Sequence, residues 1–183
     1  MKNLTKGSIL ISEPFLKDPN FIRSVVLLTE HNREGSIGFI LNKPIRYKLN
    51  EVIQEFPAFD ATVYMGGPVQ QDSLHFIHRI SSLAEEGDEV TPGVFWGGDF
   101  EKLKRMVRLG IVKSEDVRFF VGYSGWGPSQ LEQEMEMKSW IIASRPDEFA
   151  FAPRAESLWG EILQRMGGRY KAMANYPVDP SQN

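Results

Sequence analysis

The sequence predicts an α+β fold, in which one domain holds a mixed, largely antiparallel β-sheet of about eight strands packed with about four helices. Two observations lead to this prediction. Short apolar runs bounded by turn residues outnumber the helical segments, and the two kinds of segment do not alternate regularly as in a doubly wound fold. An early pair of apolar runs is also separated by a short polar stretch, which is typical of a β-hairpin.

Several segments have the period-two or continuous apolar pattern of strands. The second and third are joined by residues 31–35, and we expect a hairpin there because Gly35 accepts the positive φ that a tight turn requires. The predicted strands are Ser8–Ile11, Val25–Thr29, Ser36–Leu41, Thr62–Met65, Leu74–Ile80, Val94–Trp96, Val117–Tyr123 and Trp140–Ala143.

Apolar residues at three- and four-residue spacing predict the helices. The first helix covers residues 49–56 and is stopped by Pro57. The second covers residues 100–107, with Asp99 as its N-cap and Gly110 just beyond its carboxyl end. The longest covers residues 158–166 and ends at Gly167.

A further short helix is predicted directly after a glycine-rich loop. Ser129 and Glu132 have the spacing of a capping box, in which each side chain binds a free backbone N–H at the start of the helix. No linker interrupts residues 1–168, which we predict to form one domain. Residues 169–183 lack periodicity and contain two prolines, so we expect a loosely ordered tail there.

The composition excludes several classes of function. With no cysteine, the chain has no disulfide, thiolate nucleophile or cysteine-ligated metal. No apolar run approaches the roughly 20 residues that span a bilayer, and the amino terminus lacks the core of a signal peptide. We therefore expect a cytoplasmic protein that does not enter a membrane. The net charge of −3 argues against a protein devoted to coating nucleic acid.

The strongest candidate for a nucleophile is Ser124, in the segment GYSGW at the end of a predicted strand. This segment departs from the G-x-S-x-G nucleophile elbow, because Trp126 stands where the last glycine lets the helix pack closely. All the histidines also precede Ser124, whereas that fold places the catalytic histidine after the serine. We therefore assign no catalytic residue and favour a non-enzymatic protein, with hydrolysis through Ser124 or a carboxylate such as Glu132 as the alternative.

No metal or cofactor site is predicted. His75 and His78 lie on a predicted strand, where their odd spacing places them on opposite faces. Glu132, Glu134 and Glu136 are interpreted as solvated carboxylates. No glycine motif that cradles a phosphate is complete.

Two basic clusters raise the alternative of a DNA-linked transcriptional regulator. A helix-turn-helix would need a second amphipathic helix after Gly110, but an apolar strand follows instead. Direct contact with DNA is therefore not expected. The clusters are Lys102, Lys104, Arg105 and Arg108, and Lys43, Arg46 and Lys48.

The glycine-rich loop from Arg118 to Glu132 is the predicted functional surface. It runs from a buried strand into a helix whose free N–H groups could hold an anion or a carbonyl. Trp126 lies between two glycines of this loop, so its ring either fills the core or forms the wall of a pocket.

Five segments containing glycine and aromatic residues extend over nearly the whole ordered chain: GSILISEPFLKDPNFIRSVVLLTEH, GSIGFILNKP, MGGPV, VFWGGDFE and RFFVGYSGWGPSQLEQE. In their order and spacing they resemble the AlgH/YqgE family of bacterial proteins. The resemblance implies an α+β fold around a mixed sheet, a cytoplasmic setting and no established enzymatic activity. Members of that family are often described as transcriptional regulators.

The positions that match the pattern of this family lie on several predicted loops. Two residues depart from the commonest pattern: Ser124 is often alanine and Ser129 is often glycine, which weakens the hypothesis of a catalytic serine further. The matching positions are Pro14, Phe21, Asn42, Pro44, Gly66, Gly67, Pro68, Gly122, Gly125, Trp126, Gly127, Gln130, Leu131, Glu132 and Glu134.

From these observations we expect a binding protein whose partner is an unidentified small molecule or protein, and an indirect regulatory role is compatible with this. Asn42 and Gln130 would supply amide hydrogen bonds and Trp126 an apolar wall, which requires a cleft beside Trp126. The sequence does not predict an oligomeric state. The expected surface comprises Asn42, Pro44, Gly66, Gly67, Gly122, Ser124, Gly125, Trp126, Gly127, Gln130 and Glu132.

Overall fold

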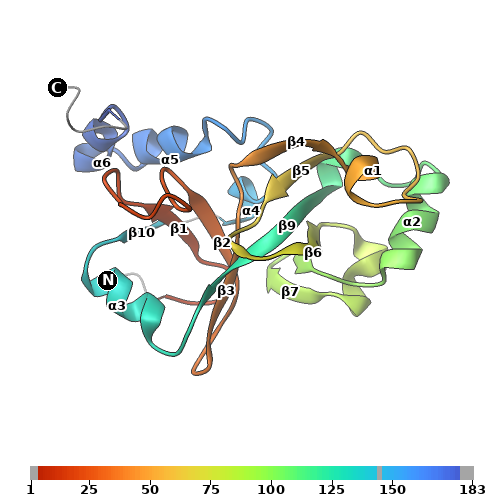
Figure 1. Ribbon diagram of the computed structural model, residues 1–183, viewed down its shortest axis with the longest axis horizontal. Coiled ribbons are helices and arrows are strands. Elements are labelled where there is room, and N and C mark those ends of the chain that lie inside the picture. Colours follow the sequence, from red (N-terminus) through yellow and green to blue (C-terminus); the bar gives the residue numbers. More distant parts are fainter. Residues whose placement is uncertain (1–3, 144–145, 178–183) are drawn as a thin grey trace.

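Ten strands form the central sheet of the computed structural model, which describes residues 4–143 and 146–177 (Figure 1). All the predicted strands are present, with their ends shifted by a few residues in several cases. The strands are β1 Ile9–Ser12, β2 Val25–Asn32, β3 Gly35–Ile40, β4 Pro44–Lys48, β5 Thr62–Met65, β6 Val69–His78, β7 Asp88–Thr91, β8 Val94–Trp96, β9 Val117–Trp126 and β10 Trp140–Ala143.

The sheet follows the order β10-β1-β2-β3-β9-β6-β8-β7, while β4 pairs with β5 and β5 pairs with β9. The β5–β9 pair is parallel and the other pairs are antiparallel. The predicted α+β fold with a mixed, largely antiparallel sheet is therefore confirmed. The strands that were not predicted, β4 and β7, each pair with one neighbour and are mostly exposed, so they lack the apolar pattern of a buried strand.

The described helices are α1 Leu49–Val52, α2 Phe100–Arg108, α3 Gln130–Glu136, α4 Pro146–Phe149, α5 Leu158–Met166 and α6 Gly168–Met173, with 3-10 helices η1 Ser81–Glu86 and η2 Ser114–Asp116. The predicted start of α2 is confirmed, because the Asp99 side chain accepts a hydrogen bond from the Lys102 backbone N–H at 2.9 Å. Helix α1 is shorter than predicted and ends before Ile53, whose backbone is extended.

Helix α6 lies in the segment for which the sequence predicts a loosely ordered tail. Tyr170 and Met173 of α6 pack against the core, which explains why the chain stays helical there without a long apolar stripe. Of the same segment, residues 178–183 lie outside the described residues.

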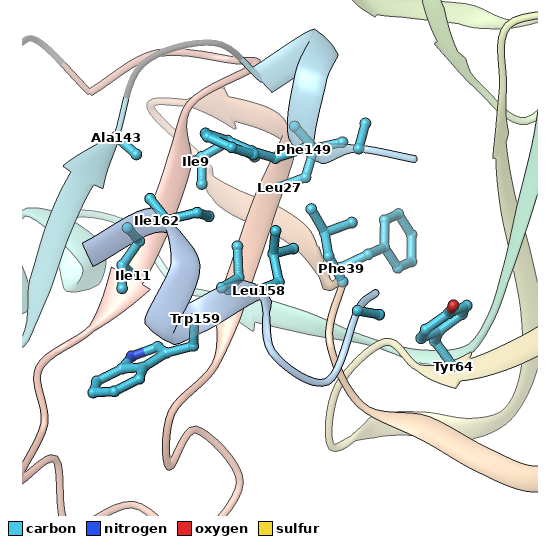
Figure 2. Close-up of a cluster of buried hydrophobic side chains, with 14 of the residues drawn as sticks. Ile9, Ile11, Leu27, Phe39, Tyr64, Ala143, Phe149, Leu158, Trp159 and Ile162 are labelled. Atoms are coloured by element: carbon cyan, nitrogen blue, oxygen red, sulfur yellow. The ribbon is translucent and has the colours of Figure 1, made fainter. Parts of the chain in front are cut away.

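Strands β1, β2 and β3 carry apolar side chains on both faces, because alternate residues of a strand point in opposite directions. Helix α5 packs on one face and α3 on the other (Figure 1). Figure 2 shows the cluster on the α5 side, where Ile9, Ile11, Leu27 and Phe39 of the strands meet Leu158, Trp159 and Ile162 of the helix. The cluster on the α3 side contains Leu10, Val26, Leu28, Ile40, Trp126, Leu131 and Trp140.

A separate apolar cluster lies at the other end of the molecule, where α1, α2 and η1 cover β5, β6 and β9 (Figure 1). Its buried members include Leu49, Val63, Phe76, Leu103 and Phe119. Strand β9 connects the two ends, since its carboxyl part pairs with β3 and the remainder pairs with β5 and β6. The predicted loop therefore begins in one end of the molecule and finishes in the other.

Candidate functional site

Three glycines of the predicted surface lie in a tight backbone contact, which we call the glycine contact. It joins Gly66 and Gly67, directly after β5, to Gly122 in the middle of β9. A Cβ atom at Gly66 would lie 2.3 Å from the Gly122 carbonyl oxygen, and one at Gly67 would lie 2.2 Å from the Tyr123 backbone. Gly122 has a φ of +65°, and a Cβ there would lie 2.7 Å from the Gly67 carbonyl oxygen. These buried glycines are therefore needed for close backbone packing.

Ser124 follows this contact and has a structural partner. Its side chain is 0% exposed, and its hydroxyl donates a hydrogen bond to the Gly66 carbonyl oxygen at 2.9 Å. No histidine nitrogen of the described residues bonds to this hydroxyl. The contact holds β9 against the segment after β5, and it supplies neither the base nor the access that a nucleophile requires.

Trp126 fills the core, and it does not line either of the cavities described below. Its ring is 5% exposed and stacks on Phe21 with ring centroids 5.8 Å apart. Its indole N–H donates to a Glu134 carboxylate oxygen at 3.0 Å, and the Trp140 indole N–H donates to the same oxygen at 2.8 Å. The burial of Trp126 therefore favours the first of its two predicted roles, the filling of the core, and Glu134 is not a purely solvated carboxylate.

The turn before α3 is closed by Gln130 and not by the predicted capping box. Ser129 has a left-handed backbone, with φ +59°, and its side chain makes no capping hydrogen bond. Gln130 instead accepts the Gly127 backbone N–H at 3.0 Å and donates to Glu134 at 3.0 Å. Gly125 and Gly127 are exposed on this turn. The Gln130 amide expected to meet a ligand is therefore already engaged within the loop.

Asn42 is likewise engaged in holding the backbone. Its side-chain oxygen accepts the Val25 N–H at 2.8 Å, and its side-chain nitrogen donates to the Arg23 carbonyl at 2.8 Å. Asn42 is buried, and these two bonds join the end of β3 to the start of β2. Its predicted role as a ligand donor is not supported by this geometry.

His75 and His78 contact different neighbours on the two faces of β6, as predicted. His78 is buried and neutral, because Nδ1 accepts the Ile80 N–H at 3.1 Å while Nε2 donates to the Gly97 carbonyl at 3.1 Å. Burial lowers the pKa of His78, against opposing contributions from the Gly97 hydrogen bond and the charge of Glu86. In residues 4–143 and 146–177, no three metal-ligating side chains gather at one point.

Two serine–histidine contacts occur, and neither has the arrangement of a catalytic pair. The Ser73 hydroxyl donates to the Gln70 carbonyl at 2.6 Å, so His75 Nε2, 2.9 Å from Ser73 Oγ, acts as the donor and not as a base. His31 Nδ1 lies 2.8 Å from Ser36 Oγ, and its Nε2 lies 3.8 Å from a Glu132 oxygen. Ser36 is buried, which denies a substrate access to this second pair.

The basic residues of α2 are largely compensated by neighbouring acids. Lys102 lies 2.7 Å from Glu86, and Lys104 lies 2.6 Å from Glu101. In the other basic cluster, Lys43 donates to the Asn20 carbonyl at 2.7 Å. The ion pairs of Lys102 and Lys104 reduce the positive charge that α2 offers to a phosphate backbone.

An open apolar groove lies next to the glycine contact, between β4 with α1 on one side and β6 on the other. It has a volume of about 380 Å³ and is lined by Ile45, Tyr47, Glu51, Val52, Met65, Gln71 and Val121. Three of these residues are the chain neighbours of the predicted Pro44, Gly66 and Gly122. The residues predicted from the sequence therefore border this groove but do not line it. Most of its lining residues are apolar residues of strands and of α1, which no motif distinguishes.

A second cavity, of about 180 Å³, is lined by Arg118 at the start of β9. Arg118 is 6% exposed and donates to the Leu41 and Ala152 carbonyls at 3.2 and 2.6 Å. Burial lowers its pKa, with an opposing contribution from Tyr64. The signal in the sequence is a single charged residue within the apolar run VRFFV, at the start of the predicted glycine-rich loop.

Comparison with known proteins gives consistent matches over almost the full length of this chain. The model of the AlgH-like family matches residues 9–171. The chain is 48% identical to a UPF0301 protein of Cytophaga hutchinsonii, over 98% of this chain and 100% of that protein. It is 44% identical to a UPF0301 protein of Chlorobaculum tepidum, over 98% of this chain and 96% of that protein.

Two solved structures share the fold. A crystal structure of a protein from Corynebacterium diphtheriae superimposes with a TM-score of 0.78 at 24% identity, over 96% of this chain and 94% of that chain. The solution structure of AlgH from Pseudomonas aeruginosa superimposes with a TM-score of 0.73 at 26% identity, over 97% and 98% of the two chains. No helix within the described ranges has the length and apolar character needed to cross a membrane. The chain belongs to the AlgH-like family.

Proposed function

We propose that this AlgH-like protein is a non-enzymatic binding protein that holds an apolar part of a small molecule or protein partner in the groove between β4–α1 and β6. The observation that carries the proposal is the groove itself, which has a volume of about 380 Å³ and mainly aliphatic and aromatic walls. Binding sites for small ligands are typically concave and apolar, with a few polar groups that orient the ligand.

The arrangement of the groove supports recognition of an apolar group. Tyr47 is 64% exposed on the edge strand β4, so its ring is available to cover a bound molecule. Glu51 and Gln71 add a carboxylate and an amide to the lining. The glycine contact behind Met65 and Val121 fixes two walls of the groove, and a rigid wall reduces the entropy lost on binding.

The alternative of a hydrolytic enzyme is less well supported. No serine, threonine, histidine or lysine lines the groove, so Glu51 is the one carboxylate there and it has no hydroxyl nucleophile of serine or threonine and no histidine beside it in the lining. The Ser124 hydroxyl is directed to the Gly66 carbonyl, and Glu132 lies outside every cavity described above. The proposal therefore assigns the glycine-rich loop a structural role beside a binding groove.

The proposal does not include direct binding to DNA. The ion pairs on α2 leave little free charge to contact phosphates, and an indirect regulatory role through a bound partner is compatible with the groove. A cytoplasmic location remains part of the proposal. Fluorescence anisotropy with duplex DNA at low salt should show no binding, because phosphate contacts are strongest under that condition.

A thermal-shift screen against a metabolite library tests the proposal, because a ligand selective for the native state raises its melting temperature. The screen should find compounds with an apolar group and no carboxylate that stabilise the natural protein. Tyr47→Ser should abolish their effect. Leu109→Ser is the matched control, since Leu109 is also exposed, at 73%, but lies outside the groove. Equal stabilisation of both variants would contradict the proposal.

A further inference from the structure

Arg118 is a buried cation that forms no ion pair with any carboxylate in the described part of the chain. Its guanidinium lies 4.6 Å from the centre of the Tyr64 ring and donates to two backbone carbonyls. A guanidinium has more N–H donors than these two bonds use. An arginine with only neutral neighbours is an unusual choice for a buried strand position, because a buried charge is normally paired.

The cavity beside Arg118 is rich in hydroxyl groups that have no partner among the described residues. Thr62, Tyr64 and Ser114 all line it, and none of their hydroxyls forms a hydrogen bond within the ranges that the structure describes. Figure 2 shows the Tyr64 ring, with its hydroxyl, at one margin of the buried cluster. The cavity therefore combines one fixed positive charge with several neutral donors.

Apolar residues form a further part of the cavity wall and restrict its size. They include Ala61, Val117, Phe151 and Pro153. The volume of about 180 Å³ corresponds to roughly six water molecules, which suits a small organic molecule and not a nucleotide. Asp60 and Glu115 also line the cavity, and their negative charges repel a doubly charged phosphate more strongly than a singly charged carboxylate.

We propose that this cavity is a binding site for a small organic monocarboxylate, whose carboxylate meets Arg118 and the hydroxyls while its apolar part lies against Phe151 and Pro153. The planar guanidinium matches a carboxylate in geometry and forms charge-assisted hydrogen bonds with it. Arg79, whose guanidinium lies 5.2 Å from the centre of the Phe151 ring, is paired with Asp116, so Arg118 supplies the positive charge of the site. This site is separate from the apolar groove of the proposed function.

The test is an NMR titration of the full-length ¹⁵N-labelled protein with benzoate, in a buffer of low chloride. Benzoate should cause saturable shifts of the backbone amides of Thr62, Tyr64, Ser114 and Arg118. Benzamide, the neutral analogue of similar shape, should cause none, and inorganic phosphate should bind at least tenfold more weakly. Absence of saturable shifts with benzoate, or equal binding of benzamide, would overturn the proposal.

Variants separate binding from folding. Arg118→Met should weaken benzoate binding by roughly tenfold or more, and Arg46→Met, which removes an exposed cation outside the cavity, should leave it unchanged. If Arg118→Met does not fold, the double variant Thr62→Val with Ser114→Ala serves instead, because both residues are exposed and unbonded. It should weaken binding by about fivefold. Unchanged benzoate affinity in the double variant would exclude the hydroxyls as ligands and overturn the site.

Discussion

A single carboxylate oxygen of Glu134 accepts hydrogen bonds from two buried indoles, those of Trp126 and Trp140. Glu134→Ala should destabilise the protein by roughly 2–4 kcal/mol, because both indole N–H groups would lose their acceptor. Urea unfolding measures the change in the free energy of unfolding.

Glu136→Ala is the control for this experiment, since Glu136 is exposed on the same helix and forms no hydrogen bond or ion pair in the described residues. Its effect should lie within about 0.5 kcal/mol. A similar loss in both variants would show that the carboxylate bridge is not what holds α3 to the sheet.

The pKa values of His75 and His78 predict how stability depends on pH. Burial lowers both values below the ordinary value of 6.5, so the unfolded chain binds protons more readily than the folded chain. The stability from these groups is present above pH 6.5 and is lost as pH falls through and below it. The urea concentration at the unfolding midpoint should therefore decrease when the pH is lowered from about 7.5 to about 5.5. The variant His78→Asn should show a smaller decrease. If the urea midpoint of the variant decreased with pH as much as that of the natural protein, this account would be contradicted.

At the scale of single residues, the sequence identified important positions more readily than their roles. The motif GYSGWG drew attention to Ser124 and Trp126, which are both buried and hydrogen-bonded. Their partners, Gly66 and Glu134, are brought to them by the packing of separate elements. A local motif contains no information about such partners, so the sequence left open whether Trp126 fills the core or forms the wall of a pocket.

At the scale of elements, α5 contains a glycine that its geometry does not require. A Cβ atom at Gly160 would meet no atom within 4 Å, and Gly160 lies inside the helix with ordinary φ. Gly160→Ala should stabilise the protein by about 0.5–1 kcal/mol, because alanine loses less backbone entropy in a helix. Urea unfolding measures whether the free energy of unfolding increases.

Gly67→Ala provides the opposite case with the same chemical change. Its Cβ atom would lie 2.2 Å from the Tyr123 backbone, and neither segment can move without disturbing the pairing of β9. We expect a loss of roughly 3 kcal/mol or more. If both alanine variants changed stability by the same amount, the tight contact would not limit packing at Gly67.

The elements that could be predicted are those with a buried face. Strand β10 has the predicted bounds because polar residues border its apolar run, and β5 ends where predicted because two glycines follow Met65. Strand β4 and helix α6 were missed because their pairing or packing partners lie far away in the chain, in β5 and in the core. For α1, Pro57 limited the predicted helix, but the extended backbone at Ile53 ends it earlier.

At the scale of the whole molecule, strands β5 and β9 both contribute residues to two separate cavities. The apolar groove draws Ile45, Met65 and Val121 from β4, β5 and β9, and Arg118 of the same β9 lines the smaller cavity. Each site is assembled from segments that are distant in sequence. This is why the fold class followed from local patterns, whereas the walls of both sites did not.

The most direct test of the proposed groove is an amide NMR titration with the carboxylate-free compound that stabilises the protein most in the thermal-shift screen. The account predicts that the largest shifts occur at Ile45, Val52, Met65 and Val121, the groove residues. Largest shifts in residues 125–132, or beside Arg118, would contradict it.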